Sequence, residues 1–327
     1  MALHPALAAV RHGVRRTLAG LEPGAAVLVA CSGGADSLAL LAATIFEARR
    51  PHVRVIGVTV DHGLQPGSAD HARHVVAQMA ALGADETASA RVQVDLGAGL
   101  GVEAAARHAR YAVLEQMREH FAAGLVLLGH TRDDQAETVL LGLTRGSGGR
   151  SLAGMRRGFD HYRRPLLDVG RDDTVTACQV DGIAFWDDPH NADPGFTRVR
   201  VRQRVLPMLE EELGPGVAAT LARTADQLRD DVEALDALAE QALADLDARS
   251  DAAGAVPLAP LHDLHRAIAS RVLRTAAVRA GAIDAEVFHV HVRALLDLAA
   301  GELSGRVQLP GAVTATRREG HLRFGPT

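Results

Sequence analysis

The sequence predicts an α/β protein with a doubly wound, mainly parallel five-stranded sheet, followed by a second, mainly helical domain that ends in a small β-hairpin. Short apolar runs rich in β-branched residues alternate with segments of helical spacing, which is typical of buried parallel strands joined by helices. The chain has 327 residues, more than one hydrophobic core usually serves, so we expect two domains. An aromatic content of 3% argues against a β-sandwich.

Composition limits the classes of function. The formal net charge is −5, so nucleic acid would have to bind at a local basic patch. All basic side chains other than histidine are arginine, and any phosphate site must therefore use backbone amides, metal or guanidinium groups. Two cysteines, Cys31 and Cys178, are too few for a disulfide framework or a thiolate metal cluster. We see no membrane-spanning run and no signal peptide pattern, and we expect a cytoplasmic protein.

The most informative stretch is residues 27–41, an apolar run that breaks at Ser32-Gly33-Gly34 and resumes with helical spacing. This pattern predicts a strand, a tight glycine turn and a helix. Glycines let a ligand approach the backbone, and amides at a helix start bind phosphate. Asp36 is placed to hold Mg²⁺ against that phosphate. The stretch is neither a Walker loop nor a Rossmann fingerprint, and a plain connecting turn remains the alternative.

Polar residues follow two further predicted strands. Residues 53–61 end at Asp61, on the edge where α/β sheets bind ligands; a solvated turn is the alternative. Residues 125–129 form another strand that runs into His130 and a helix. A third, weaker strand is expected near residues 91–94, after a helix at 68–82.

Asp134 and Glu137 lie three residues apart at the start of that helix, so their side chains are neighbours. A helix cap and the helix dipole also favour acids in a first turn. Position favours a functional interpretation, because this strand end and the glycine turn should share one edge of the sheet. The two acids would then face the nucleotide loop.

Arginines are concentrated in three places. Arg107 and Arg110 project from one face of a predicted helix at 102–121, which composition alone would make a solvated face. The segment 145–164 and the segment 198–204 are the most basic parts of the chain. We interpret both segments as a surface for a phosphate backbone, in preference to a merely soluble surface.

The domain boundary is predicted at Gly214-Pro215-Gly216, which gives domains 1–213 and 214–327. Beyond it, helical spacing over 217–246, 268–279 and 285–300 precedes an alternating segment at 306–324. That segment predicts the terminal hairpin.

Taken together, several motifs resemble those of the tRNA(Ile)-lysidine synthase family, in the PP-loop ATP pyrophosphatase superfamily. The motifs are Ser32-Gly-Gly-Ala-Asp-Ser37, Val60-Asp-His-Gly-Leu64, Glu103-Ala-Ala-Ala-Arg-His-Ala-Arg-Tyr111, His130-x-x-Asp-Asp-Gln-Ala-Glu-Thr-Val-Leu-Leu141 with Arg145-Gly-Ser147, Asp188-Pro-x-Asn-x-Asp-Pro-x-Phe-x-Arg-x-Arg-x-Arg202 and the Leu309-Pro-Gly311 turn. The match runs in order through about the first 210 residues. Val199 departs from the asparagine usual in the family, and the chain looks like a short form without an extra C-terminal domain.

The resemblance implies an ATP-dependent ligase that joins lysine to carbon 2 of the wobble cytidine in tRNA(Ile) with a CAU anticodon. An adenylated cytidine is the intermediate, and pyrophosphate and AMP are released. The implied catalytic residues are Asp36, Asp134 and Glu137. Implied ATP-binding residues are Ser32, Gly33, Gly34, Ala35, Asp36, Ser37, Asp61 and His130. Arg107, Arg110, Asp134 and Glu137 would bind lysine or the activated nucleotide, and Arg145, Arg150, Arg198, Arg200 and Arg202 would bind tRNA. The expected cofactor is Mg²⁺ on Asp36, the C-terminal domain would help bind tRNA, and a homodimer is compatible with the family.

Two other classes of function remain open. One is a different adenylating enzyme with the same loop, such as a tRNA thiolase or an amidotransferase-type synthetase. A thiolase needs reactive or cluster-binding cysteines, and the chain has no room for a glutaminase domain. The other is a non-catalytic nucleotide-binding module, which would leave the acids and arginines without a role.

Overall fold

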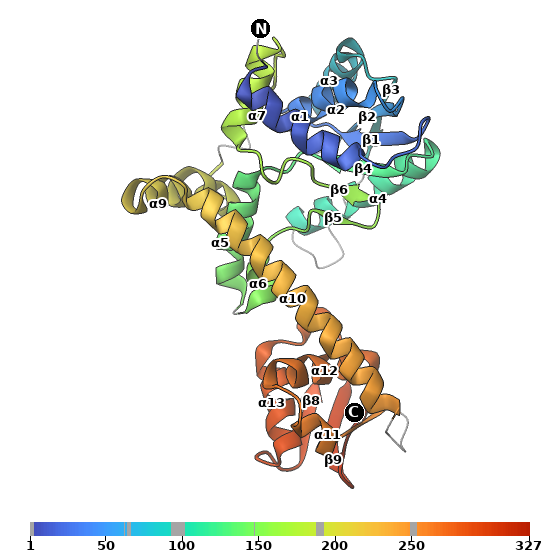
Figure 1. Ribbon diagram of the computed structural model, residues 1–327, viewed down its shortest axis with the longest axis vertical. Helices are drawn as coiled ribbons and strands as arrows, with labels where there is room; N and C mark the ends of the chain where they lie inside the picture. The colour runs from blue at the N-terminus through green and yellow to red at the C-terminus, as the bar shows by residue number, and fades with distance from the viewer. Residues whose placement is uncertain are drawn as a thin grey trace. The chain divides into compact units, whose positions relative to one another are not determined.

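The computed structural model describes residues 3–61, 63, 67–92, 102–146, 148–187, 193–248 and 254–327, without the side chains of 102–107 and 145. The chain forms two compact units (Figure 1). Unit 1 comprises Met1–Gly146 and Ser151–Asp226, and unit 2 comprises Ser147–Arg150 and Gln227–Thr327. The predicted boundary at residues 213/214 stays a prediction.

Unit 1 is built on a six-stranded sheet in the order β3-β2-β1-β4-β6-β5. All neighbouring strands are parallel except the edge pair β5–β6, which confirms a mainly parallel sheet. The sixth strand was not expected, because two-residue strands are too short to show a hydrophobic period. The strands are β1 (Ala26–Ala30), β2 (Arg54–Asp61), β3 (Glu86–Arg91), β4 (Leu125–Leu128), β5 (Gly158–Phe159) and β6 (Tyr162–Arg163).

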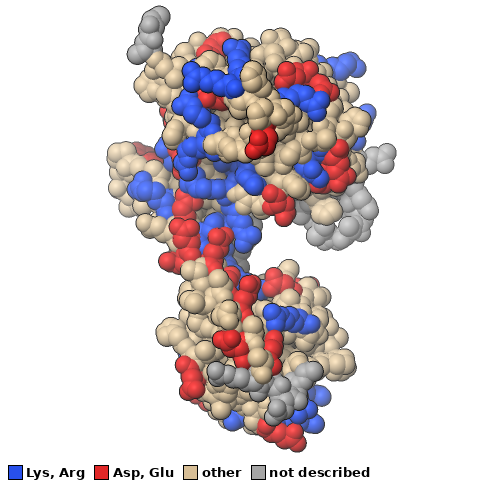
Figure 2. All heavy atoms as spheres, turned by 45° about the vertical axis from the view of Figure 1, so that its right-hand side comes forward, with Lys and Arg blue, Asp and Glu red and all other residues tan. Residues whose placement is uncertain are grey.

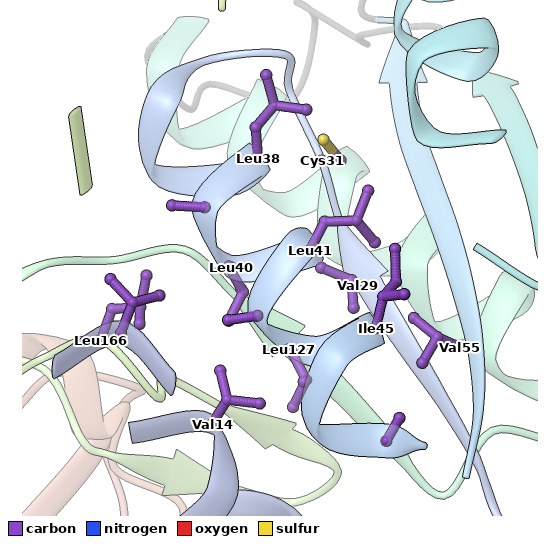
Figure 3. Packing of buried hydrophobic residues seen from close by; sticks show 14 of the residues in the cluster. Val14, Val29, Cys31, Leu38, Leu40, Leu41, Ile45, Val55, Leu127 and Leu166 are labelled. Carbon is purple, nitrogen blue, oxygen red and sulfur yellow. The ribbon is translucent and has the colours of Figure 1, made fainter. Parts of the chain in front are cut away.

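Helices cover both faces of this sheet, as a doubly wound fold requires. Successive strand residues point to opposite faces. Val27 and Val29 of β1 pack in a cluster with α1, α2, α3 and α7, part of which Figure 3 shows. Leu28 packs on the other face with Leu114 of α4. The helices of unit 1 that come before residue 190 are α1 (Pro5–Leu18), α2 (Ala35–Ala48), α3 (Ser68–Leu82), α4 (Val102–His120), α5 (Arg132–Arg145) and α7 (Arg171–Val180).

The strand order brings two loops together at the carboxyl edge of the sheet. β1 pairs with β4, so the turn into α2 lies beside the turn into α5. Gly129 lies at this contact: a Cβ added there would be 3.2 Å from the backbone carbonyl of Asp36 and 3.2 Å from Cα of Ser37. A glycine after β4 therefore allows the nucleotide loop and the start of α5 to lie close together.

The basic segment after residue 196 is helical. It runs through α8 (Thr197–Arg200), a π-helical turn (Val201–Val205) and α9 (Leu206–Leu213). The first turns of α10 (Val217–Ala248) pack with α9 and with Ala136 of α5. In a helix, residues four apart share a face, so Arg198 and Arg202 both point toward α5.

Unit 2 contains α6 (Gly149–Leu152, in part), the later turns of α10, α11 (Leu258–His262), α12 (Arg266–Arg279) and α13 (His289–Ala300). Its four-stranded antiparallel sheet has the order β7-β10-β9-β8. The strands are β7 (Ala255–Pro257), β8 (Arg306–Leu309), β9 (Val313–Arg318) and β10 (His321–Pro326). The predicted terminal hairpin is thus part of a larger sheet. Within the described residues, no helix is both long and apolar enough to span a membrane.

Candidate active site

The turn after β1 has the geometry of an anion-binding loop. Gly33 has φ of +85°, a left-handed conformation that favours glycine. Gly34 is the N-cap of α2, whose first amides face the turn,. Ser37 closes the loop, since its hydroxyl donates to the Gly34 carbonyl (2.9 Å) and accepts from the Ser32 N–H (3.1 Å). Residues 32–37 thus form the glycine turn before a helix that the sequence predicted; that the turn binds phosphate stays a prediction.

Asp36 lies in the first turn of α2 and has two partners on α7. Its carboxylate accepts a hydrogen bond from the Thr174 hydroxyl and lies 3.5 Å from Nε of Arg171. Burial raises the pKa of Asp36, and Arg171 and Thr174 offset part of that rise,.

Asp134 belongs both to a helix cap and to the site. Thr131 is the N-cap of α5, and its N–H (2.8 Å) and hydroxyl (3.1 Å) donate to Oδ2 of Asp134. Oδ1 of Asp134 is left for Arg171 at 2.9 Å and Arg202 at 3.3 Å. One carboxylate oxygen of Asp134 therefore caps the helix, and the other contacts the arginines of the candidate site.

Glu137 is fully buried, with 0% of its side chain exposed, beneath three arginines. Its oxygens accept from Arg171 (Nη1, 3.3 Å), Arg198 (Nε, 3.0 Å) and Arg202 (Nε, 2.7 Å). These three side chains retain 24–32% exposure. Among the described residues, these three guanidinium groups are thus more exposed than the carboxylate they bind.

Arg171 connects the nucleotide loop with the paired acids. Besides its bonds to Asp36, Asp134 and Glu137, its backbone N–H donates to Oδ2 of Asp133 at 2.8 Å. Burial alone would raise the pKa of Asp134, but Arg171, the Thr131 N–H, His130 and Arg202 together hold the pKa below its ordinary value. Asp134 is therefore ionised at neutral pH.

Sequence reasoning missed Arg171. It is the first residue of α7, at the helix end where the dipole disfavours a cation. A cation in that position needs nearby carboxylates to stabilise it, and this is the signal that could have identified it. The helix α7 itself was not predicted.

Two predicted ATP-binding residues lie at neighbouring strand ends. Asp61 ends β2, accepts from the Gly63 N–H (2.9 Å) and lies 3.8 Å from Nε of Arg91. His130 follows β4, and its Nδ1 accepts from Nε of Arg164 at 3.3 Å. Arg164 is only 6% exposed, so the prediction that the whole 145–164 segment is a surface is wrong for this residue, whose guanidinium bonds inside unit 1.

The remaining predicted arginines are spread out. Arg110 lies on α4 with its guanidinium 5.8 Å from the Tyr111 ring, and the side chains of Arg107 and Arg145 lie outside the described residues. Arg150 pairs with Asp236 at 2.8 Å, and Arg200 donates to the carbonyl of Pro194 at 2.7 Å. On the face shown in Figure 2, arginines gather in a band over unit 1 with acidic side chains among them.

The donor set fits Mg²⁺ only with help from a bound phosphate. The described residues contain no cluster of three or more metal-ligating side chains. Asp36 offers one carboxylate beside the phosphate cradle, and Mg²⁺ is commonly held by one or two carboxylates together with phosphate oxygens and water. Asp36 therefore fits a metal ion that arrives with a nucleotide.

The fold and this loop define the class of protein. Residues 9–209 match the PP-loop domain family, and the chain belongs to it; such domains use ATP. A solved structure of a U34-tRNA thiolase from Methanococcus maripaludis with its [4Fe-4S] cluster has the same fold, with a TM-score of 0.57, 18% identity and coverage of 68% of this chain and 79% of that one. At that identity the likeness is one of fold alone.

Much closer relatives define the family within this class. The chain is 47% identical to the tRNA(Ile)-lysidine synthase of Streptomyces coelicolor over 352 residues, covering 98% of this chain and 99% of that one. It is 51% identical to the tRNA(Ile)-lysidine synthase of Thermobifida fusca over 320 residues, covering 97% of each. The chain belongs to the tRNA(Ile)-lysidine synthase family.

Proposed function

We propose that this protein joins lysine to carbon 2 of the wobble cytidine of tRNA(Ile) with a CAU anticodon, at the expense of ATP. The observation that carries the proposal is the position of Arg171, which bonds at once to Asp36 of the nucleotide loop and to Asp134 and Glu137. These contacts support a single site that contains the proposed phosphate cradle and the carboxylates proposed to bind an amine. Similarity to tRNA(Ile)-lysidine synthases supports lysine as the amine.

The proposed reaction has two steps. The 2-oxygen of cytidine attacks the α-phosphorus of ATP, the bond to pyrophosphate breaks, and an adenylated cytidine forms. The ε-nitrogen of lysine then attacks carbon 2, the bond from carbon 2 to oxygen breaks, and AMP leaves. One proton from the attacking nitrogen must go to a base, and the ε-amine, protonated at neutral pH, must lose another proton first.

Each loop and acidic residue has a proposed role. Backbone amides of residues 32–37 hold the phosphates. Asp36 holds Mg²⁺, which neutralises charge on the phosphates when bound. Asp134 binds and orients the lysine ammonium, because a carboxylate with a lowered pKa is a weak proton acceptor,. Glu137, three residues further along α5, is proposed to bind the same ammonium group.

Basic side chains outside this cluster are proposed to hold RNA. Arg110 and Arg107 on α4 would hold the phosphate of the activated nucleotide or the tRNA. Arg145, Arg150 and Arg200 are proposed to contact the tRNA backbone, with unit 2 contributing further surface. The proposed compartment is the cytoplasm and a homodimer is retained as a proposal.

A thiolase reaction fits the cysteines poorly. A [4Fe-4S] cluster commonly takes four thiolates, and the chain has two cysteines. Both thiols are buried; burial raises the pKa of Cys31 and raises that of Cys178 to about 12. Neither thiol is therefore a ready nucleophile.

A direct assay tests the proposal. The protein is incubated with ATP, Mg²⁺, lysine and tRNA(Ile) with a CAU anticodon, and the digested nucleosides are analysed by mass spectrometry. We expect lysidine with one AMP and one pyrophosphate per modified tRNA, and none with a GAU anticodon, which lacks the target cytidine. Asp134→Asn and Glu137→Gln should abolish the product while the protein still folds. A wild-type protein without product, or full turnover in both variants, would refute the proposal.

A further inference from the structure

The arrangement of the acids creates a conflict that the proposed function must resolve. Lysine is proposed to place its ammonium on Asp134 and Glu137, yet Glu137 is fully buried and bonded to three arginines. Three guanidinium groups already balance the charges of Asp36, Asp134 and Glu137. A further cation would therefore have to compete with guanidinium groups for the oxygens of Asp134 and Glu137,.

Arg171 shares with Arg202 the two carboxylate oxygens that an ammonium would need. Its Nη2 lies 2.9 Å from Oδ1 of Asp134, and its Nη1 lies 3.3 Å from Oε1 of Glu137. One planar guanidinium thus spans one oxygen from each carboxylate. If it leaves, each of these oxygens loses a donor and the two together face one gap, which suits the three N–H donors of an ammonium.

Of these three arginines, Arg171 contacts the nucleotide loop. Its Nε lies 3.5 Å from Oδ2 of Asp36, in the first turn of α2. Arg198 and Arg202 approach from α8 and the π-helical turn. In the described part of the chain, their hydrogen bonds go to α5, including one from Arg198 to the Thr138 hydroxyl at 2.8 Å.

A bound nucleotide changes the charge balance beside Arg171. A triphosphate in the cradle adds several negative charges next to Asp36, and guanidinium groups bind phosphate oxygens in a bidentate manner. The side chain of Arg171 is 24% exposed, so it is not locked in a sealed interior. Phosphate therefore competes with the carboxylates for this guanidinium, while Arg198 and Arg202 keep their hydrogen bonds to Glu137.

We propose that Arg171 is a positioning residue that exchanges partners: it holds Asp134 and Glu137 in the free enzyme and moves to the nucleotide phosphates when ATP binds. The exchange removes one donor from each of the two carboxylates while Arg202 keeps its bonds to them, so lysine binds after ATP. Arg171 thereby prevents lysine from occupying the site before the nucleotide is present. This inference rests on the proposed function, since it takes lysine as the amine.

Lysine affinity measured with and without nucleotide tests the exchange. The full-length protein is titrated with ε-¹⁵N-lysine in the presence of Mg²⁺, with or without saturating α,β-methylene ATP, which cannot release pyrophosphate. Unlabelled protein contributes no ε-amine signal because the chain contains no lysine. For wild type we expect lysine to bind about tenfold more tightly with the analogue, a usual coupling between linked sites. Lysine should tighten binding of the analogue by the same factor, because linkage is reciprocal.

Variants separate positioning from a structural role. In Arg171→Gln the coupling should fall below about twofold, and lysine should bind the nucleotide-free variant more tightly than it binds nucleotide-free wild type. A structural defect alone would weaken lysine binding in both states. Arg15→Gln is the matched control, because Arg15 pairs with Glu47 on the exposed surface of unit 1 and should keep the wild-type coupling.

Several results would overturn the exchange: equal lysine affinity for wild type with and without the analogue, no measurable lysine binding in either state, or full coupling in Arg171→Gln. If that variant does not fold, a crystal structure of wild type with the analogue decides. Guanidinium nitrogens of Arg171 on phosphate oxygens support the proposal, and their persistence on Asp134 and Glu137 refutes it. If the protein forms lysidine but lysine and nucleotide binding are not coupled, only the partner exchange of Arg171 is refuted. If the two binding events are coupled but no lysidine forms, only the proposed reaction is refuted.

Discussion

Replacing each glycine of the nucleotide loop by alanine should have two different effects. Gly33 has φ of +85°, and a Cβ there would lie 2.7 Å from Cγ2 of Val75 and 3.2 Å from Cε1 of His71. The left-handed conformation costs an alanine about 1–2 kcal/mol, and pushing aside the fully buried Val75 adds about 1–3 kcal/mol. We therefore expect Gly33→Ala to lose about 3 kcal/mol of stability, or about 6–12 °C in the Tm of a unit of this size.

Gly34→Ala is the matched control for folding. Gly34 has φ of −79°, and the atoms nearest to an added Cβ are 3.7 and 3.9 Å away. Losing glycine as the N-cap should cost less than about 1 kcal/mol, while the new methyl group should raise the KM for ATP by holding phosphate off the backbone. Differential scanning calorimetry and ATP titration measure the two effects. Equal Tm values for Gly33→Ala and wild type, or equal losses in the two variants, would refute the reasoning.

Four further predictions follow from the ion-pair cluster and the thiols. In a double-mutant cycle, Glu137→Gln and Arg202→Gln should each destabilise the protein, with a coupling energy of about 2 kcal/mol from thermal or urea unfolding; additive losses would contradict the contact. Because the pKa of Asp134 is lowered in the folded protein, ionised Asp134 stabilises the fold above its unfolded pKa of about 3.9, and this stabilisation is lost as the pH falls through the folded pKa. The Tm difference between wild type and Asp134→Asn should therefore shrink below about pH 4. For Asp36, whose pKa is raised, wild type should lose stability relative to Asp36→Asn as the pH rises from the unfolded through the folded pKa,; parallel pH profiles for the two variants would contradict these environments. Cys178→Ala should retain lysidine formation. Because burial raises the pKa of the Cys178 thiol to about 12, this thiol should react with iodoacetamide only after the protein unfolds. Rapid alkylation of the folded protein would refute this.

The long elements of unit 1 could be predicted because their hydrophobic periods are clear. The strands at 54–61 and 125–128 and the helices at 68–82 and 102–120 match the expected segments to within one or two residues. The third strand lies at 86–91, a few residues before its expected position, because ETASAR carries little apolar signal,. Short elements such as β5, β6 and β7 depend on pairing with distant strands and have no local pattern.

The sequence indicated the nucleotide loop and the two acids of the candidate site, but not the arginines that contact them. The loop after β1 and the acids at the start of α5 follow from the rule that ligands bind at the carboxyl edge of a parallel sheet. The contact of Arg198 and Arg202 with Glu137 was not foreseen, because it depends on a helical backbone with residues four apart on one face. Whether these two arginines also contact tRNA stays a prediction. Arg171 could be recognised only once α7 was brought beside α2 and α5.

A structure of the protein with α,β-methylene ATP, Mg²⁺ and lysine tests the central claim most directly. We expect the phosphates at the amides of residues 32–37 and the ε-nitrogen of lysine within hydrogen-bonding distance of Oδ1 of Asp134 or Oε1 of Glu137. Lysine bound away from both carboxylates, or phosphates bound away from the loop after β1, would contradict it.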